Sequence, residues 1–342
     1  MNTGTRGRKQ DKGNNAFLCF SERGYQLAER IRAATGGDIS RTGAQLTLDA
    51  WTRNAFASYD ALIYIGASGI AVRAVAPYLK DKTTDPAVLV IDETGRFVIP
   101  LVSGHLGGAN ALAKRIADIT GAEAVITTAT DRHGVFAVDE WARVQGFYVA
   151  NPERIKAVSA KLLNGDPVTV HSVIPVDGPA PDGVCLTDKR IADVSVGFME
   201  DMSGLRLVPR MLVLGCGCKK GVSADTLQKR FRLLCGETGI DREAVARLAT
   251  IDIKEEEPGI RAFCDRNGWE ISAYGAEELA KTSGDFSASA FVEDTVGVDN
   301  VCERSAVLAS GGELLVRKFA GEGVTFALAK MRIRADWRLT DG

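Results

Sequence analysis

Short apolar runs alternate with amphipathic stretches along most of this chain. Ala61–Ile65 and Ala87–Ile91 are apolar or aromatic throughout, which is typical of strands buried on both faces of a parallel sheet. The residues between them, from 70 to about 76, have the spacing of a helix, and the turn residues at 92–95 predict a hairpin to a strand at 97–101. Strands that alternate with helices predict a mostly parallel sheet covered on both faces, with ligands at the carboxyl ends of its strands.

Further segments follow the same alternation. They are strands at 16–20, 124–128, 211–214, 313–316 and 324–330, and helices after Ser21, at 110–119 and at 224–235.

The stretch from about residue 134 to 205 has a different pattern. It combines a helix after Asn151, short strands around 168–170 and 184–186, and a cluster rich in proline and glycine. The chain is therefore predicted to be α/β, with two α/β domains of mostly parallel sheets joined by a small α+β middle segment. We expect a disordered leader at 1–15, an N-terminal α/β domain at 16–134, the middle segment at 135–206 and a C-terminal α/β domain at 207–342.

Composition and charge disfavour several classes of protein. The 342 residues are 45% hydrophobic and 25% charged, which is enough apolar material for packed cores and too little charge for a disordered chain. Forty-two basic against 44 acidic side chains give a formal charge of -2, which predicts neither nucleic-acid nor membrane binding. Seven cysteines without a CxxC pair indicate reduced thiols and a cytoplasmic protein. The apolar stretch at 61–79 contains Arg73, which opposes membrane insertion.

Two glycine-rich loops are expected at the ligand edge of the first sheet. The first is GASGIAVR, whose glycines let the backbone approach a ligand and whose arginine can hold an anion. Its candidate ligand-binding residues are Gly66, Ser68, Gly69 and Arg73. The loop matches neither nucleotide phosphate-binding pattern, and the alternative is a tight turn with a surface arginine.

The second loop, VSGHLGGAN, carries a hydroxyl, an imidazole and an amide at a junction between a strand and a helix. Its candidates are Ser103, Gly104, His105, Gly107, Gly108 and Asn110. His105 can act as a general base near pH 7, and N–H groups near the two adjacent glycines can hold an oxyanion. The alternative is a histidine that only makes hydrogen bonds. No GxSxG elbow occurs, which disfavours a serine hydrolase of the usual α/β type.

Two later segments add candidates. TTATDRHG places Asp131 and His133 after a strand, at the same predicted edge as the glycine loops; Asp131 is interpreted as functional, and His133 as structural. His171 is also interpreted as structural. LGCGCKKGVS offers a second anion site on the other domain, with Gly217, Lys219, Lys220, Gly221 and Ser223 as candidates. Its cysteines lack a partner pair at zinc spacing, which favours packing over metal binding.

The ordered motifs GASGIAVRAVAP, VIPLVSGHLGGANALA, VITTATD, LGCGCKKG and SASAFVEDTVGVDNVCERSAVLASGG resemble those of the cobalt-precorrin 5A hydrolase family of anaerobic cobalamin biosynthesis. The resemblance runs from about residue 50 to 335. It implies opening of the ring δ-lactone and loss of a two-carbon fragment as acetaldehyde, giving cobalt-precorrin 5B. Glu303 matches a glutamate of the family, whereas its neighbours Cys302, Arg304 and Ser305 depart from the small residues expected there.

This resemblance implies a tetrapyrrole substrate with several carboxylates on a flat apolar ring, and no cofactor, because cobalt arrives within the substrate. A base such as His105 or Asp131 would activate water against the lactone, with Ser103 beside it. Glu303 or Asp131 could serve the later proton transfer. A non-catalytic corrinoid carrier and a nucleotide-binding regulator are the alternatives. Transient contact with other corrin-pathway enzymes is compatible with the resemblance, and the oligomeric state is not predicted.

Overall fold

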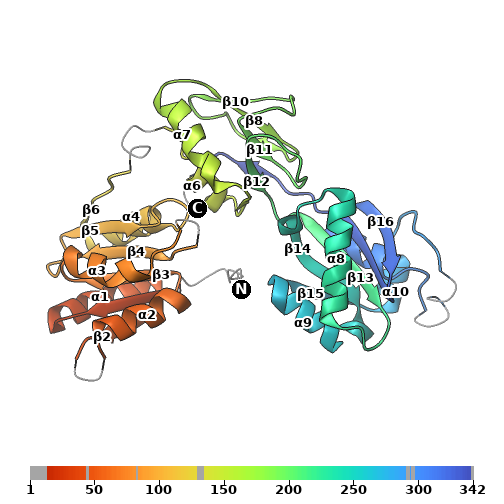
Figure 1. Cartoon of the computed structure of the whole chain (residues 1–342), viewed down its shortest axis with the longest axis horizontal. Helices are drawn as coiled ribbons and strands as arrows, with labels where there is room; N and C mark the ends of the chain where they lie inside the picture. Colours follow the sequence, from red (N-terminus) through yellow and green to blue (C-terminus); the bar gives the residue numbers. More distant parts are fainter. Residues whose placement is uncertain are drawn as a thin grey trace.

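The computed structural model describes residues 14–43, 46–81, 84–128, 135–289, 293 and 297–339, and it has an α/β fold (Figure 1). Three larger sheets follow one another along the chain, and most of their strand pairs are parallel. The predicted fold class is confirmed. The predicted leader lies outside the described residues except for its last two positions, and Asn15 already belongs to the first strand.

The first sheet has the strand order β2-β1-β3-β4-β5-β6. Its strands are β1 Asn15–Cys19, β2 Asp38–Arg41, β3 Ala61–Ile65, β4 Ala87–Ile91, β5 Phe97–Val102 and β6 Glu123–Ala124. Strands β1 to β4 are parallel, whereas β5 is antiparallel to β4 and carries β6 parallel to itself. The chain therefore reverses direction between β4 and β5.

Helices cover both faces of this sheet. They are α1 Glu22–Thr35, α2 Leu48–Ser58, α3 Ser68–Val75, the 3-10 helix η1 Ala76–Tyr78 and α4 Ala109–Thr120. Successive β3 side chains point to opposite faces: Ile63 packs in the core of α1 and α4, and Tyr64 in the core of α2 and α3. The cap predicted for the first helix is present, because the Ser21 side chain accepts a hydrogen bond from Gly24 N.

The second sheet has the order β10-β8-β11-β12-β7. Its strands are β7 Tyr148–Val149, β8 Val168–Ser172, β10 Val184–Leu186, β11 Val194–Val196 and β12 Leu205–Val208, and its helices are α6 Val138–Val144, the 3-10 helix η2 Pro152–Arg154 and α7 Ile155–Leu163. All pairs except β12 with β7 are parallel. The predicted helix does begin after Asn151, but the Asn151 side chain makes no capping hydrogen bond, because it donates to Gly204 O and accepts from Arg206 N instead.

The third sheet has the order β15-β14-β13-β17-β16. Its strands are β13 Leu212–Cys218, β14 Val245–Ile251, β15 Glu270–Tyr274, β16 Glu313–Gly321 and β17 Val324–Lys330. Its helices are α8 Ala224–Thr238, α9 Pro258–Asn267, α10 Ala276–Lys281 and α12 Cys302–Ser310, with 3-10 helices η3 Arg242–Ala244 and η4 Asp252–Lys254. Antiparallel β17 and β16 complete a sheet that is otherwise parallel.

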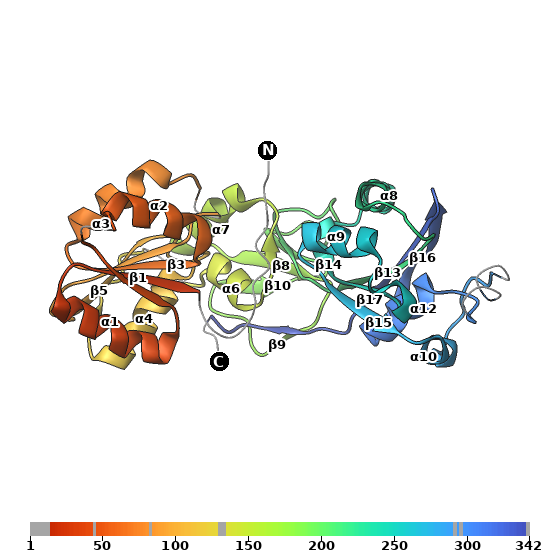
Figure 2. The same ribbon diagram turned by 90° about the horizontal axis from the view of Figure 1, so that it is seen from below.

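The second and third sheets share one hydrophobic core. After β17 the chain returns to the side of the second sheet, where β18 Ala335–Asp336 and β9 Val176–Asp177 form a separate two-stranded parallel sheet (Figure 2). Trp141 of α6 donates a hydrogen bond to Asp336 O at 2.6 Å and stacks on Trp337 at 5.0 Å between ring centroids. The return segment therefore fastens α6 to the end of the chain. The domain boundaries predicted from the sequence stay predictions.

Two expected elements differ in extent. The strand predicted at 124–128 is only Glu123–Ala124, although Val125 N still donates to Val98 O at 2.9 Å. The segment from Gly215 to Cys218, expected to be a loop, belongs to β13. Among the described residues, no helix is long and apolar enough to cross a membrane.

Close packing explains the glycine at 215. A Cβ atom there would lie 1.8 Å from the carbonyl oxygen of Cys302, so α12 can pack on β13 only if this position has no side chain. We expect Gly215→Ala to lower the free energy of unfolding by roughly 1–3 kcal/mol, because it overpacks this contact. Urea unfolding followed by circular dichroism measures the change.

Gly236 of α8 is the matched control, because nothing lies within 4 Å of a Cβ placed there. Gly236→Ala should raise the free energy of unfolding by roughly 0.5–1 kcal/mol. A Gly215→Ala protein as stable as the parent would contradict this account of the helix–sheet contact.

Candidate functional site

The GASGIAVR loop leaves the first sheet at the end where β3 and β4 finish. Gly66 N donates a hydrogen bond to Ile91 O at 2.8 Å, which places the loop beside the last residue of β4. Ser68 and Gly69 open α3, and Arg73 is exposed on its last turn. The predicted turn before a helix is present, and its ligand-binding role stays a prediction.

The VSGHLGGAN loop leaves the same sheet at the opposite end. Because β5 is antiparallel to β4, its last residue, Val102, lies beside Val88, and Ser103 Oγ donates to Asp85 O at 3.0 Å. Strands of five residues at about 3.3 Å each put the two edges roughly 16 Å apart. The prediction that both glycine loops share one edge is therefore wrong, and the cause is the reversal at the hairpin.

Backbone geometry fixes the shape of this second loop. Ser103 has φ 57°, an uncommon conformation for a residue with a side chain, and its carbonyl accepts from Ala109 N at 3.1 Å. A Cβ at Gly107 would lie 2.3 Å from Ser103 Cβ, so only glycine fits there. Gly108 has φ 79° and its N–H donates to His105 O at 2.9 Å. The loop is a tight, internally bonded turn at the start of α4.

Asn110 ties the loop to the chain after β6. Its backbone N–H donates to Gly104 O at 2.9 Å, and its buried amide donates to Thr128 Oγ1 at 2.9 Å. The chain that leads to residue 131 therefore reaches the edge where His105 lies. Asp131 and His133 themselves lie outside the described residues, so their predicted roles stay predictions.

His105 meets a carboxylate from the second sheet's first helix. Its Nδ1 lies 3.2 Å from Oδ2 of Asp139, and the two side chains are only 10% and 12% exposed. The other carboxylate oxygen of Asp139 accepts from Glu140 N at 3.1 Å. A histidine whose Nδ1–H donates a hydrogen bond to a fixed carboxylate keeps one tautomer and one orientation.

An ion pair lies next to this contact. Arg143 donates to Glu140 Oε1 at 2.9 Å, and each of the two side chains is 11% exposed. Burial raises the pKa of Glu140, while the charges of Arg143 and His105 act in the opposite direction. A Cβ at Gly108 would lie 3.6 Å from Arg143 Cδ, so the glycine loop and α6 are in close contact.

Sequence reasoning missed the three charged residues of α6. Asp139, Glu140 and Arg143 belong to no recognised motif, and they follow TTATDRHG, the segment in which Asp131 is the residue interpreted as functional. One signal was present: two adjacent acids precede Trp141 on a short apolar helix, where carboxylates are expected to need partners.

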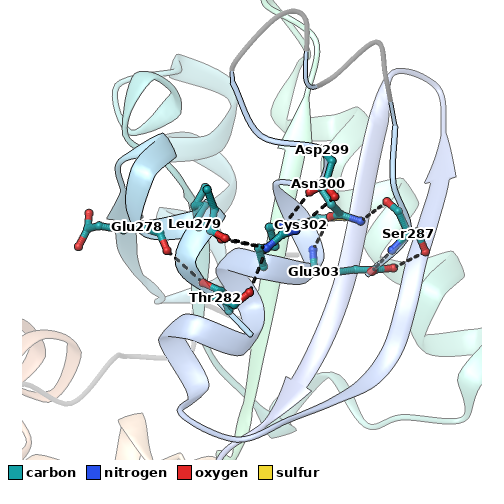
Figure 3. A network of polar contacts seen from close by, with 10 residues as sticks. Glu278, Leu279, Thr282, Ser287, Asp299, Asn300, Cys302 and Glu303 are labelled. Carbon is teal, nitrogen blue, oxygen red and sulfur yellow. Dashed lines mark hydrogen bonds and ion pairs between the residues drawn. The ribbon is translucent and has the colours of Figure 1, made fainter. Parts of the chain in front are cut away.

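Glu303 lies in a different network, at the start of α12 (Figure 3). Its carboxylate is fully buried and accepts hydrogen bonds from Ser287 Oγ at 2.9 Å, Ser287 N at 2.8 Å and Lys318 N at 2.7 Å. Asn300 adds a bridge, because it accepts from Glu303 N and donates to Ser287 O. Among the described residues, no hydrogen bond joins Glu303 to His105. The catalytic role predicted for Glu303 stays a prediction.

The second predicted anion site is partly filled by the protein itself. Gly221 N donates to Glu257 Oε1 at 2.7 Å, and Lys254 Nζ donates to Oε2 at 3.1 Å. The hydrogen bond from Gly221 and the nearby lysines lower the pKa of Glu257. Ser223 caps α8 by accepting from Thr226 N at 3.2 Å. A carboxylate of this chain therefore already uses part of the predicted cradle.

The remaining candidates of this segment fall into two groups. Lys219 and Lys220 are exposed, whereas Gly217 lies in β13, where a Cβ would come within 2.7 Å of Thr325 Oγ1. Cys216 is buried and hydrogen-bonded with Cys218, which raises the pKa of Cys216. In the described part of the chain, no group of three or more potential metal-ligating side chains comes together.

Three family models match successive parts of the chain. They are described as "Cobalamin synthesis G N-terminal" over residues 50–131, "Cobalamin biosynthesis central region" over 136–192 and "Cobalamin synthesis G C-terminus" over 212–329. A protein from Salmonella typhimurium named cobalt-precorrin-5A hydrolase is 34% identical, over 92% of this chain and 96% of its own. The chain belongs to the cobalamin synthesis G family.

A second relative agrees with this membership. A protein of the same name from Priestia megaterium is 32% identical, over 80% of this chain and 79% of its own. The crystal structure of a putative cobalamin biosynthesis protein G homolog from Sulfolobus solfataricus is 22% identical, with a TM-score of 0.41 over 93% of this chain and 97% of that one. The resemblance predicted from the motifs is confirmed, and this cobalamin synthesis G chain has a role in cobalamin biosynthesis.

The candidate residues lie in the ranges of three different family models. In this cobalamin synthesis G chain, His105 lies in the N-terminal match, Asp139 in the central match and Glu303 in the C-terminal match. The structure brings the first two into contact and gives the third its own buried network.

The hydrogen bonds of Glu303 should contribute to the free energy of unfolding. Glu303→Gln would put an amide NH₂ against groups that themselves donate, so at least one hydrogen bond is lost in a buried site. We expect the free energy of unfolding to fall by roughly 1–3 kcal/mol in urea unfolding. Exposed Glu277→Gln on α10 is the control and should stay within about 0.5 kcal/mol. Equal stability of the two variants would contradict the structural role of this carboxylate.

Proposed function

We propose that this protein hydrolyses cobalt-precorrin 5A, opening the ring δ-lactone and releasing acetaldehyde to give cobalt-precorrin 5B. The name of the substrate comes from the curated relatives that match most of the chain. The observation that carries the chemistry is the contact between His105 and Asp139, since it supplies a positioned base on the VSGHLGGAN loop.

The geometry supports a defined role for each group of this pair. Nδ1–H of His105 donates to Asp139, which makes Nε2 the basic nitrogen of the ring. His105 takes a proton from water as the water oxygen attacks the lactone carbonyl, and Asp139 stabilises the imidazolium that forms. Water thereby cleaves the acyl–oxygen bond and leaves a carboxylate and a hydroxyl group.

The carbon–carbon cleavage follows from the new hydroxyl group. Loss of its proton lets the two-carbon fragment leave as acetaldehyde, and the electron pair of the broken bond stays on the ring, where it takes up a proton. This step needs a second acid–base group. Asp131 and Glu303 remain the candidates predicted for it.

One glycine of the VSGHLGGAN loop offers an N–H group for the oxyanion that forms during lactone opening. The N–H of Gly108 already donates to His105 O. Within the described part of the chain, the N–H of Gly107 makes no backbone hydrogen bond, so it is the group we assign to the oxyanion. Cobalt belongs to the substrate in this proposal, and the absence of a resident cofactor stays a prediction.

Replacing the base should abolish most of the turnover. We expect His105→Ala to lower kcat by roughly 10²- to 10⁴-fold, the usual range for losing general acid–base catalysis. The measurement is anaerobic incubation with cobalt-precorrin 5A, with acetaldehyde and the mass loss of the corrinoid quantified together.

Two controls separate catalysis from other effects. His171 lies on β8 and its Nδ1–H donates to Thr187 O, and Arg73 lies at the opposite edge of the first sheet from His105. His171→Ala and Arg73→Ala should therefore change kcat less than about threefold. A His105→Ala protein with near-parental kcat would reject this base and favour Asp131. Substrate binding without any acetaldehyde from the parent protein would support the carrier alternative instead.

A further inference from the structure

A groove lies along the segment that connects β17 to β18. It has a volume of about 320 Å³, and one wall is apolar, with Ile174 and Pro175 from the second sheet's unit and Met211 before β13. The connecting segment forms the other wall and brings Lys330 and Arg332 to the groove. Small-molecule sites begin at about this volume, so the groove is large enough for one edge of a bigger ligand.

Backbone hydrogen bonds hold both ends of the connecting segment. Met331 N donates to Met211 O at 2.8 Å, and Ala335 N donates to Pro175 O at 2.9 Å. The second and third sheets, which supply the walls, also share one hydrophobic core. The groove is therefore formed by fixed elements before any ligand arrives, which lowers the entropic cost of binding.

The basic residues of the groove differ in their partners. Arg334 is neutralised, because its guanidinium donates to both carboxylate oxygens of Asp177 on β9. Lys330 and Arg332 form no ion pair with any described residue, even though Glu313 is the register neighbour of Lys330 on β16. Two cations that form no ion pair with a described residue therefore lie beside an apolar wall.

We propose that this groove binds an apolar molecule that carries at least two carboxylates, with Lys330 and Arg332 each facing one of them. The apolar wall distinguishes such a ligand from a small hydrated anion, and the two cations distinguish it from an uncharged one. This proposal rests on the proposed function, whose substrate is a macrocycle of this chemical class.

The chain connects the groove to the catalytic pair. Beyond Arg334, β18 leads to Asp336, whose carbonyl accepts from Trp141 of α6, the helix that also carries Asp139. A ligand with one edge in the groove is thus held on the same packed unit that orients His105. The groove is a docking subsite and contributes no reacting group.

The test uses the full-length protein and cobyrinic acid, a cobalt corrinoid with free carboxylates, as the probe. Equilibrium dialysis at low ionic strength, read by corrin absorbance, gives the dissociation constant. Lys330→Ala/Arg332→Ala should weaken binding roughly tenfold, as expected for two partly exposed ion pairs. Arg232→Ala on exposed α8 is the matched control and should leave binding unchanged.

The outcomes separate the two proposals. Binding by the double variant within twofold of the parent, no binding of the probe by the parent, or equally tight binding of citrate would overturn the groove proposal. Circular dichroism and the urea midpoint establish that the double variant is folded. If the double variant loses probe binding as expected but the parent releases no acetaldehyde from cobalt-precorrin 5A, the proposed function fails while the groove stands.

Discussion

The hydrogen bond between His105 and Asp139 joins the loop after β5 of the first sheet to helix α6, which packs on the second sheet. His105 is positioned by a strained turn at the end of β5, and Asp139 by the first turn of α6. Because the two groups come from different segments, this hydrogen bond forms only when both units pack together. The contact therefore depends on the packing that holds His105 and Asp139 in place.

Packing around α6 supplies much of that constraint. Trp141 is fully buried, stacks on Trp337 and donates to the backbone of β18, so the last described strand of the chain holds the helix that carries Asp139. The shared core of the second and third sheets holds β18 in turn. The C-terminal unit thereby acts on the His105–Asp139 pair through α6.

The sequence predicted helices and strands correctly where apolar runs and capping side chains determine them. The buried strands at Ala61–Ile65 and Ala87–Ile91 and the helix capped by Ser21 follow from apolar runs and a capping side chain. The shared edge of the glycine loops was wrong although the hairpin at 92–95 was predicted, because its reversal of β5 was not carried through to the loop. The contact between Asp139 and His105 could not be predicted, since only tertiary packing places α6 against His105.

The central claim is that His105 and Asp139 act as one unit, and a double-mutant cycle on kcat tests it most directly. For groups that act together, the second substitution costs little once the first is made. The account predicts that His105→Ala/Asp139→Asn turns over cobalt-precorrin 5A about as slowly as His105→Ala alone, while Asp139→Asn by itself is already strongly impaired. Fold-reductions that multiply in the double variant would contradict it.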